Sequence, residues 1–452
     1  MPVFEARTEI EASAGDAFRW HERPGAFARL TPPWHRIEVL EASGGIENGA
    51  RRVMKIGIPP LAVRWAALHE GYEEGRRFVD VQESGPFARW VHEHLFADAG
   101  SGRSVLVDRI DYTLPLGAAG DWALGSFTHQ GLLRLFRYRS AITACDIARH
   151  APYRNEPPLR VAITGASGMV GQQLAAFLTA GGHEVLRFAR GRKAADGEVG
   201  WNPEGARIDH EALEGLDAVV HLAGAPIADG RWTPERKAQI LSSRVTGTKF
   251  LAESLAALRE PPKVLLTASG IGIYGNRGVT RVDETAAPGE GFLADVVKKW
   301  ERAAEPAAAA GIRTVNLRLG IVLSARGGAL AKMLLPFKLG LGGPIGDGRQ
   351  VFSWIALDDV IYAIHHLIRR HDVRGPVNVV APGALPQREF ATELGRVLRR
   401  PAVIPLPERA VRGLFGQLGE ETLLSGCFVE PAALRRAGFK WDVLRLSDAL
   451  SR

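Results

Sequence analysis

Residues 159–182 read LRVAITGASGMVGQQLAAFLTAGG, an apolar run followed by spaced glycines and then a second apolar run. The first six residues have the pattern of a buried β-strand, and QQLAAFLTA has that of a helix. Between them, Gly165, Gly168 and Gly171 have the spacing GxxGxxG. Glycines at such a turn allow a sharp bend, a close approach of an anion to the backbone, and tight packing of the helix. The segment therefore predicts a strand, a phosphate-binding turn and a helix.

Strands and helices continue to alternate downstream of this turn. Further apolar strands are predicted at 184–188, 218–222, 264–268 and 314–317, with helical runs between them. This alternation is typical of a parallel sheet covered on both faces. We therefore predict an α/β fold class with a doubly wound Rossmann sheet, which binds a dinucleotide at the carboxyl ends of its strands. The predicted cofactor contacts on the first turn are Gly165, Ser167, Gly168, Met169 and Gly171.

The second strand ends at Arg190, where a site for NAD usually has a carboxylate that binds the adenosine ribose. A guanidinium suits the 2′-phosphate, so Arg190 favours NADP, with Arg192 and Lys193 as further cations. An exposed basic turn is the alternative interpretation. In the stretch DAVVHLAGAPI, the small residues Ala223 and Gly224 at the end of the strand would allow the cofactor to lie across it, although packing also explains them. The predicted contacts here are Leu222, Ala223 and Gly224.

The alternation of strands and helices is preceded by an irregular segment at residues 151–158, where APYRNEPP places three prolines among polar residues. We interpret it as a linker. Upstream, the pattern predicts a strand from Phe4 to Ile10, a helix capped by Ser13, a short second helix, six strands and a long helix. The six strands are expected near 37–40, 51–56, 63–69, 78–82, 90–97 and 105–112. The predicted domains are residues 1–150, 159–375 and 376–452.

Apolar residues recur in the long helix at steps of three or four, which predicts one buried face. This face comprises Phe127, Gly131, Leu135, Tyr138, Ile142 and Cys145. The element order resembles the helix-grip fold of the START-like and polyketide-cyclase-like superfamily. The resemblance implies an α+β domain in which a curved sheet wraps the last helix around a cavity for an apolar ligand.

Composition excludes several classes of partner. The net charge of +7 divides into −1 for residues 1–150 and +8 for residues 151–452, with no basic run interleaved with aromatics, so we predict no nucleic-acid partner. No apolar run approaches the roughly 18 residues of a membrane span, and the N-terminus lacks the order of a signal peptide. We therefore expect a cytoplasmic protein. The sequence leaves the oligomeric state open.

Metal sites find little support in the sequence. The two cysteines, Cys145 and Cys427, are far apart, which argues against a disulfide framework and a cysteine-based zinc site. His92 and His94 share one face of a predicted strand, but no third ligand is evident. We therefore expect polar residues on a sheet surface there, and no metal.

Several downstream stretches together resemble one family. They are HLAGAPIADGRW (221–232), SSRVTGT (242–248), SGIGIYG (269–275), LPFKLGLGGPIGDGRQVFSWIALDDV (335–360), RGPVNVVAP (374–382) and LRRAGFKW (434–441). They resemble the atypical extended short-chain dehydrogenases called nucleoside-diphosphate-sugar epimerase-like, some of which are labelled cell-division inhibitors. The resemblance implies a Rossmann fold, a nicotinamide cofactor, and a substrate cleft between the sheet and residues 376–452. It implies no particular substrate.

Short-chain dehydrogenases usually use Tyr-x-x-x-Lys, because the lysine charge lowers the pKa of the tyrosine. None of the six tyrosines here has lysine four residues later, and the corresponding helix has Leu293 and Val297 in these positions. The candidate catalytic residues are therefore Ser269, which could bind a carbonyl, and Tyr274, which could donate a proton if its pKa is lowered. The alternative for Tyr274 is a packing role in the wall of the cleft.

Other polar and aromatic residues near these motifs receive weaker assignments. Lys298, Lys299 and Glu301 are expected to form a solvated helix face. Four residues in the family-like loops line the cleft or anchor the loops: Arg231, Trp232, Arg349 and Trp354.

Three hypotheses of function follow. The first is an NADP(H)-dependent oxidoreductase or epimerase that acts on a small organic substrate, with an N-terminal domain that binds an apolar ligand. The second is a non-catalytic NADP(H)-binding regulator or scaffold, which the missing Tyr-Lys pair permits. The third is a carrier of a hydrophobic ligand that the nucleotide domain regulates.

Overall fold

The computed structural model describes residues 2–58, 60–190 and 197–452. The chain separates into two compact units. The N-terminal unit is Met1–Pro158 with Ala175–His183, and the Rossmann unit is Leu159–Leu174 with Glu184–Arg452. Within these described ranges, every helix is too short or too polar to cross a membrane.

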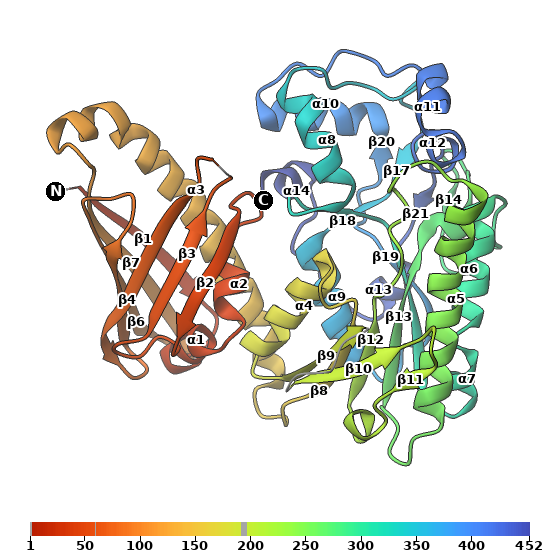
Figure 1. The fold of residues 1–452 in the computed structure, drawn as a ribbon, viewed down its shortest axis with the longest axis horizontal. Coiled ribbons are helices and arrows are strands. Elements are labelled where there is room, and N and C mark those ends of the chain that lie inside the picture. Colours follow the sequence, from red (N-terminus) through yellow and green to blue (C-terminus); the bar gives the residue numbers. More distant parts are fainter. Residues whose placement is uncertain (1, 59, 191–196) are drawn as a thin grey trace. The chain divides into compact units, whose positions relative to one another are not determined.

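The part of the N-terminal unit before residue 151 forms one antiparallel sheet and three helices, in the predicted order (Figure 1). Its seven strands pair in the order β1-β7-β6-β5-β4-β3-β2. Helices α1 (Ala14–Glu22) and α2 (Ala26–Leu30) follow the first strand, and α3 (Ala118–His150) follows the last. The strands are β1 (Val3–Ile10), β2 (Ile37–Ser43), β3 (Arg51–Ile56), β4 (Val63–Glu73), β5 (Arg77–Ser84), β6 (Arg89–Gly100) and β7 (Arg103–Thr113). The predicted α+β element order is confirmed.

The buried face of the sheet follows the alternation of the sequence, whereas that of α3 does not begin where predicted. In β1, Phe4, Thr8 and Ile10 are buried between exposed residues. On α3, Phe127 is 80% exposed, and Gly131 is exposed as well. The apolar stripe that packs on the sheet starts only at Leu132, because the first turns of α3 bury no apolar side chain.

Arg29 of α2 and Asp146 of α3 form a fully buried ion pair. Arg29 donates through Nε and Nη2 to the two carboxylate oxygens of Asp146, both at 2.8 Å, and neither side chain is exposed. Removing two charges from water is unfavourable, and the two parallel charge-assisted hydrogen bonds offset part of this cost. The pair therefore fixes α2 on α3.

The Rossmann unit contains an eight-stranded sheet in the order β11-β10-β9-β8-β12-β13-β15-β19. Its pairs are parallel except for β10 with β11 at one edge. The predicted doubly wound class and its strands are confirmed. The strands are β8 (Arg160–Thr164), β9 (Glu184–Arg190), β10 (Glu198–Asn202), β11 (Arg207–Ile208), β12 (Ala218–His221), β13 (Val264–Gly270), β15 (Arg313–Leu319) and β19 (Gly375–Val379). The sequence did not predict β10, β11 and β19, of which β11 and β19 are the two edge strands.

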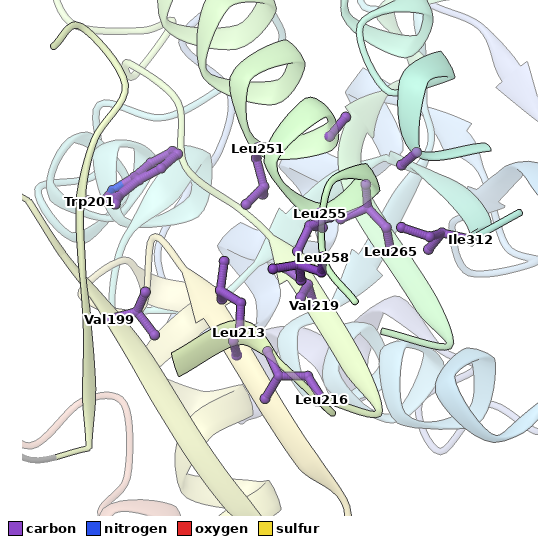
Figure 2. Close-up of a cluster of buried hydrophobic side chains, with 13 residues drawn as sticks. Val199, Trp201, Leu213, Leu216, Val219, Leu251, Leu255, Leu258, Leu265 and Ile312 are labelled. Carbon is purple, nitrogen blue, oxygen red and sulfur yellow. The ribbon is translucent and has the colours of Figure 1, made fainter. Parts of the chain in front are cut away.

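Helices cover this sheet and close its core. The helices that follow its strands are α4 (Met169–Ala180), α5 (Pro234–Ala256), α6 (Phe292–Arg302), α7 (Glu305–Ala309) and α9 (Leu357–Arg369). Figure 2 shows one core cluster, in which Leu251 and Leu255 of α5 pack near Val219 and Leu265 of the central strands. All four side chains are fully buried. The core thus holds the strands rigidly, and their carboxyl ends can carry a site.

The C-terminal segment is tied back into the Rossmann unit. The predicted boundary at 375/376 falls inside β19, so this segment supplies the edge strand of the sheet. Asp359 of α9 is fully buried and accepts from the backbone amides of Asp442 and Val443. The remaining elements are β14 (Arg281–Val282), β16 (Ile321–Leu323), α8 (Gly328–Lys338), β17 (Val351–Phe352), β18 (Trp354–Ala356), β20 (Leu385–Pro386), α10 (Gln387–Leu398), α11 (Glu408–Phe415), α12 (Gln417–Thr422), β21 (Phe428–Val429), α13 (Ala432–Arg436), α14 (Leu446–Ser451) and three short 3₁₀ helices.

The buried ion pair of the N-terminal unit generates a test of stability. Asp146→Ala leaves the Arg29 charge buried, and we expect the free energy of unfolding of this unit to fall by about 3–5 kcal/mol. The double variant Arg29→Met, Asp146→Leu removes both charges and should lose much less. Hydrogen exchange of peptides from β7 and α3 in increasing urea reports on this unit separately.

The control for this test is the surface pair Arg7–Glu5, whose side chains are 71% and 43% exposed. Glu5→Ala should change the free energy of unfolding by less than about 1 kcal/mol. Equal losses in Asp146→Ala and Glu5→Ala would contradict the role given to the buried pair.

Candidate functional site

The glycine turn lies between β8 and α4, where the sequence predicted it. Gly165 has φ +67°, and a Cβ atom there would lie only 2.9 Å from the backbone nitrogen of Ala223. A Cβ atom at Gly171 would lie 2.3 Å from the carbonyl oxygen of Gly165. Both glycines are therefore required for close packing of the turn, on β12 and on α4. Ser167 and Gly168 are exposed at its tip.

A polar contact locks the same turn to the neighbouring strand. The Thr164 hydroxyl oxygen accepts from the amides of Leu222 (3.0 Å) and Ala223 (3.2 Å), and it lies 2.7 Å from His221 Nδ1. Since both lone pairs are used, the hydroxyl proton points to Nδ1, which makes His221 a neutral imidazole protonated at Nε2. Burial lowers the pKa of His221 to about 4, which keeps this state at neutral pH.

Beyond β12, Gly224 faces a guanidinium. A Cβ atom at Gly224 would lie 3.5 Å from Cζ of Arg244 on α5. Arg244 donates to the carbonyl oxygens of Ala225 and Ile240, and its guanidinium lies 4.9 Å from the Trp300 ring. Burial lowers the pKa of Arg244 to about 10, and among the described residues no carboxylate pairs with it. It is therefore a cation that a phosphate could neutralise.

Arg190 is the last residue of β9, as predicted, and it is exposed. The carboxyl ends of parallel strands meet at one edge, so Arg190 shares the edge with the glycine turn. Arg192 and Lys193 lie outside the described residues. Met169, the first residue of α4, is close to Gly327 and Gly328 at the start of α8, since Cβ atoms there would lie 3.6 and 3.4 Å from its side chain.

A buried polar network occupies the carboxyl ends of β13 and β15. Ser269 donates through Oγ to Glu301 Oε1 at 2.6 Å, and Arg318 donates to both oxygens of Glu301, at 2.8 and 2.9 Å. The expectation that Glu301 lies on a solvated helix face is wrong, because its side chain is only 13% exposed. Glu301 sits one turn after Val297 on the inner side of α6, where Arg318 supplies its counter-charge. Lys299 is exposed, and Lys298 pairs with Asp295.

Tyr274 belongs to the same network. It is fully buried, its hydroxyl donates to Asn378 Oδ1 at 2.7 Å, and it accepts from Arg318 Nη1 at 2.9 Å. Burial raises the pKa of the Tyr274 phenol, and the Arg318 guanidinium offsets only part of this rise. The lowered pKa considered for Tyr274 is therefore not found.

The two positions of the missing Tyr-Lys pair serve packing. Val297 lies in the apolar cluster that contains Tyr274. Leu293 packs against Gly272, because a Cβ atom added to Gly272 would lie 3.2 Å from the Cβ atom of Leu293. Trp232 and Trp354 are buried and donate to the carbonyl oxygens of Ile227 and Gly383, so they anchor their loops. Arg231 and Arg349 are exposed.

Sequence reasoning missed several residues of this edge. Glu301 and Arg318 come from elements that meet only in the fold. Arg244 stands in SSRVTGT, a stretch already noticed, but its nearness to Gly224 was not visible there. The contact between Thr164 and His221 had a signal in the sequence, because Thr164 is the last residue of the first strand. A hydroxyl at a strand end can form hydrogen bonds with the amides of the next strand.

Comparison with known proteins gives a consistent result. Residues 161–380 match the model of the NAD dependent epimerase/dehydratase family, and residues 406–452 match a domain of unknown function, DUF1731. An epimerase family protein of Mycobacterium bovis is 42% identical over 290 residues, which are 64% of this chain and 96% of the relative. The human epimerase family protein SDR39U1 is 36% identical over 65% of this chain and 98% of its own length.

Solved structures agree. The crystal structure of a nucleoside-diphosphate sugar epimerase from Corynebacterium glutamicum has a TM-score of 0.79 and 30% identity, covering 99% of this chain and 89% of that one. The structure of human SDR39U1 with NADPH has a TM-score of 0.60 and covers 65% of this chain and 98% of its own. This chain belongs to the NAD dependent epimerase/dehydratase family, as one of its SDR39U1-like epimerase family proteins.

Proposed function

We propose that the Rossmann unit binds NADP(H) and acts as an oxidoreductase or epimerase on a small organic substrate. The glycine turn carries this proposal. Gly165 has no side chain between the turn and β12, and the backbone at the tip of the turn is exposed, so a phosphate can approach it. Arg190 and Arg244 supply cations at the same edge for phosphate groups. The structure of the human relative with NADPH supports the choice of NADP over NAD.

A bound nicotinamide would supply the hydride acceptor. Residues of the chain must then accept the proton that the substrate hydroxyl loses. Ser269 donates its hydroxyl proton to Glu301, so towards a substrate hydroxyl its oxygen would act as an acceptor rather than as a donor to a carbonyl. On oxidation, the substrate proton passes to Ser269 Oγ while the serine proton passes to Glu301 Oε1. Arg318 holds the carboxylate in position for this transfer.

The second candidate is an NADP(H)-binding regulator or scaffold without catalysis, for example one related to cell division. The observation that favours it is the sealed network at the strand ends. Tyr274 has both hydroxyl contacts filled by protein groups, and Ser269 is only 4% exposed. Turnover of the cofactor with any substrate decides between the two candidates.

A ligand role for the N-terminal unit also remains a proposal. A small cavity of about 10 Å³ lies between the sheet and α3, with Leu30 and Leu106 as its apolar lining and Thr8, His21, His94, Asp108, Arg139, Ser140 and Thr143 as its polar lining. This space has room for about one water molecule, so a larger ligand would require the unit to open. A hydrophobic-ligand carrier is the third candidate, and apolar compounds extracted from the purified protein would support it.

Cofactor preference is the first test of the proposed function. We expect NADPH to bind roughly 10- to 150-fold more tightly than NADH, because a hydrogen bond to a charged phosphate contributes about 1.5–3 kcal/mol. Arg190→Asp should abolish or reverse this preference. Fluorescence titration with both reduced cofactors measures it.

Arg187→Asp is the matched control, since Arg187 is exposed on the same strand, three residues before its end. The charge change is the same, and the preference for NADPH should remain. Equal affinities of the parent protein for NADPH and NADH would remove the assignment of Arg190.

The proton path is the second test. Ser269→Ala should slow single-turnover hydride transfer by about 100- to 10,000-fold, the range of a lost general acid or base. Tyr274→Phe should leave this rate within several-fold but lower the free energy of unfolding by about 1–3 kcal/mol, because buried partners lose a hydrogen bond. Rates are measured by stopped-flow absorbance of the nicotinamide with a panel of small alcohols and sugar nucleotides.

Cofactor affinity is measured in parallel, so that a binding defect is not mistaken for a slow transfer. A parent rate retained in Ser269→Ala would exclude the serine path. No turnover by the parent protein with any member of the panel would favour the non-catalytic candidate.

A further inference from the structure

Two histidines of the N-terminal unit lie in a buried polar cluster, and the expectation that they belong to a sheet surface is wrong. His92 and His94 are 3% and 6% exposed. They point to the same face of β6, because they are two residues apart. Strand register then adds carboxylates to them. Asp80 of β5 is directly opposite His92, and Asp108 of β7 is directly opposite His94.

Three ligand atoms converge within this cluster. Asp80 Oδ2 lies 3.2 Å from His94 Nε2 and 3.7 Å from His92 Nδ1, and potential ligand atoms of the three residues all lie within 4.8 Å of one another. A tetrahedral zinc ion with bonds of about 2.0–2.1 Å needs ligand atoms about 3.3 Å apart. The spacing therefore suits a metal ion with little rearrangement.

The opposite nitrogens of the two imidazoles lie near one shared carboxylate oxygen. Asp108 Oδ1 lies 3.0 Å from His92 Nε2 and 2.8 Å from His94 Nδ1. A carboxylate only accepts, so the hydrogen bond to Asp108 places a proton on Nε2 of His92 and turns its Nδ1 lone pair towards Asp80, whereas the contact of Asp108 with His94 Nδ1 is close but lacks hydrogen-bond geometry. Carboxylates support metal-binding histidines in this way in many proteins.

Asp80 is supported as well. His69 of β4, directly opposite Asp80, places Nε2 2.7 Å from Asp80 Oδ1, which leaves Oδ2 for the ligand position. The Asp80 side chain is 26% exposed, whereas those of His92, His94 and Asp108 are at most 7% exposed. An ion could therefore enter from solvent on the side of Asp80, whereas the buried side chains of His92, His94 and Asp108 close the opposite side.

We propose that Asp80, His92 and His94 bind a divalent transition-metal ion such as Zn²⁺, with Asp108 and His69 as outer supports. Two imidazoles and one carboxylate are ligands that zinc accepts, and a site with three protein ligands keeps its fourth position for water or a small ligand. His94 and Asp108 also line the small cavity between the sheet and α3. The inference concerns the N-terminal unit and is independent of the function proposed for the Rossmann unit.

Metal content of the full-length, untagged protein tests the site. The protein is stripped with chelator, loaded with Zn²⁺ or Co²⁺, dialysed, and analysed by elemental mass spectrometry and by the visible absorption of Co²⁺. We expect His92→Gln and Asp80→Asn each to hold one equivalent less than the parent protein. The difference between parent and variant isolates this site from any other.

Two further variants keep the test sharp. His129→Gln changes an exposed histidine of α3 in the same unit and should retain the full metal content. His69→Gln removes only an outer support and should weaken Zn²⁺ binding by about 10- to 100-fold. Circular dichroism confirms that each variant is folded. Equal metal content in the parent protein and folded His92→Gln, or a parent protein that holds no Zn²⁺, would overturn the proposal.

Discussion

The glycine turn and the end of β12 touch through their backbones, and this contact sets the geometry of the whole site. Gly165 lies so close to Leu222 and Ala223 that a Cβ atom has no space between them. The Thr164 hydroxyl then ties both amides to β8, and Nδ1 of neutral His221 accepts a hydrogen bond from this hydroxyl. These contacts fix the ends of β8 and β12 relative to each other. The amides of the turn and of the first residues of α4 therefore face one position, where a phosphate can bind.

The polar network at β13 and β15 depends on the same edge. In the family that the sequence resembles, a tyrosine and a lysine on one helix handle protons, whereas in this chain those positions pack as Leu293 and Val297. One turn further along α6, Glu301 provides a carboxylate of the opposite charge to that lysine, and Arg318 is its partner. Arg318 also binds Tyr274, which joins the network to β19 through Asn378. A change at any member is therefore expected to affect the others, since buried polar groups depend on one another for hydrogen bonds.

The N-terminal unit shows how a sheet collects chemistry that no single strand contains. His69, Asp80 and His92 come from three consecutive strands and lie side by side, because antiparallel register places directly opposed residues on one face. Burial would make such a cluster costly if its members were unpaired. Each of them instead contacts an oppositely charged or polar neighbour, which permits a buried site on the inner face.

The sequence by itself determined the elements of this protein. Period-two and helical patterns located the seven N-terminal strands, the three helices around them and the main strands of the Rossmann sheet, because hydrophobic spacing is a local property. It also placed the glycine turn and Arg190, since a phosphate-binding turn has its residues close together in the chain. Tertiary structure alone decided the burial of Glu301, its pairing with Arg318, the raised pKa of Tyr274 and the approach of Asp80 to His92 and His94. These depend on strand register and helix packing, which bring together residues as far apart as Tyr274 and Asn378, and no local pattern records such pairs.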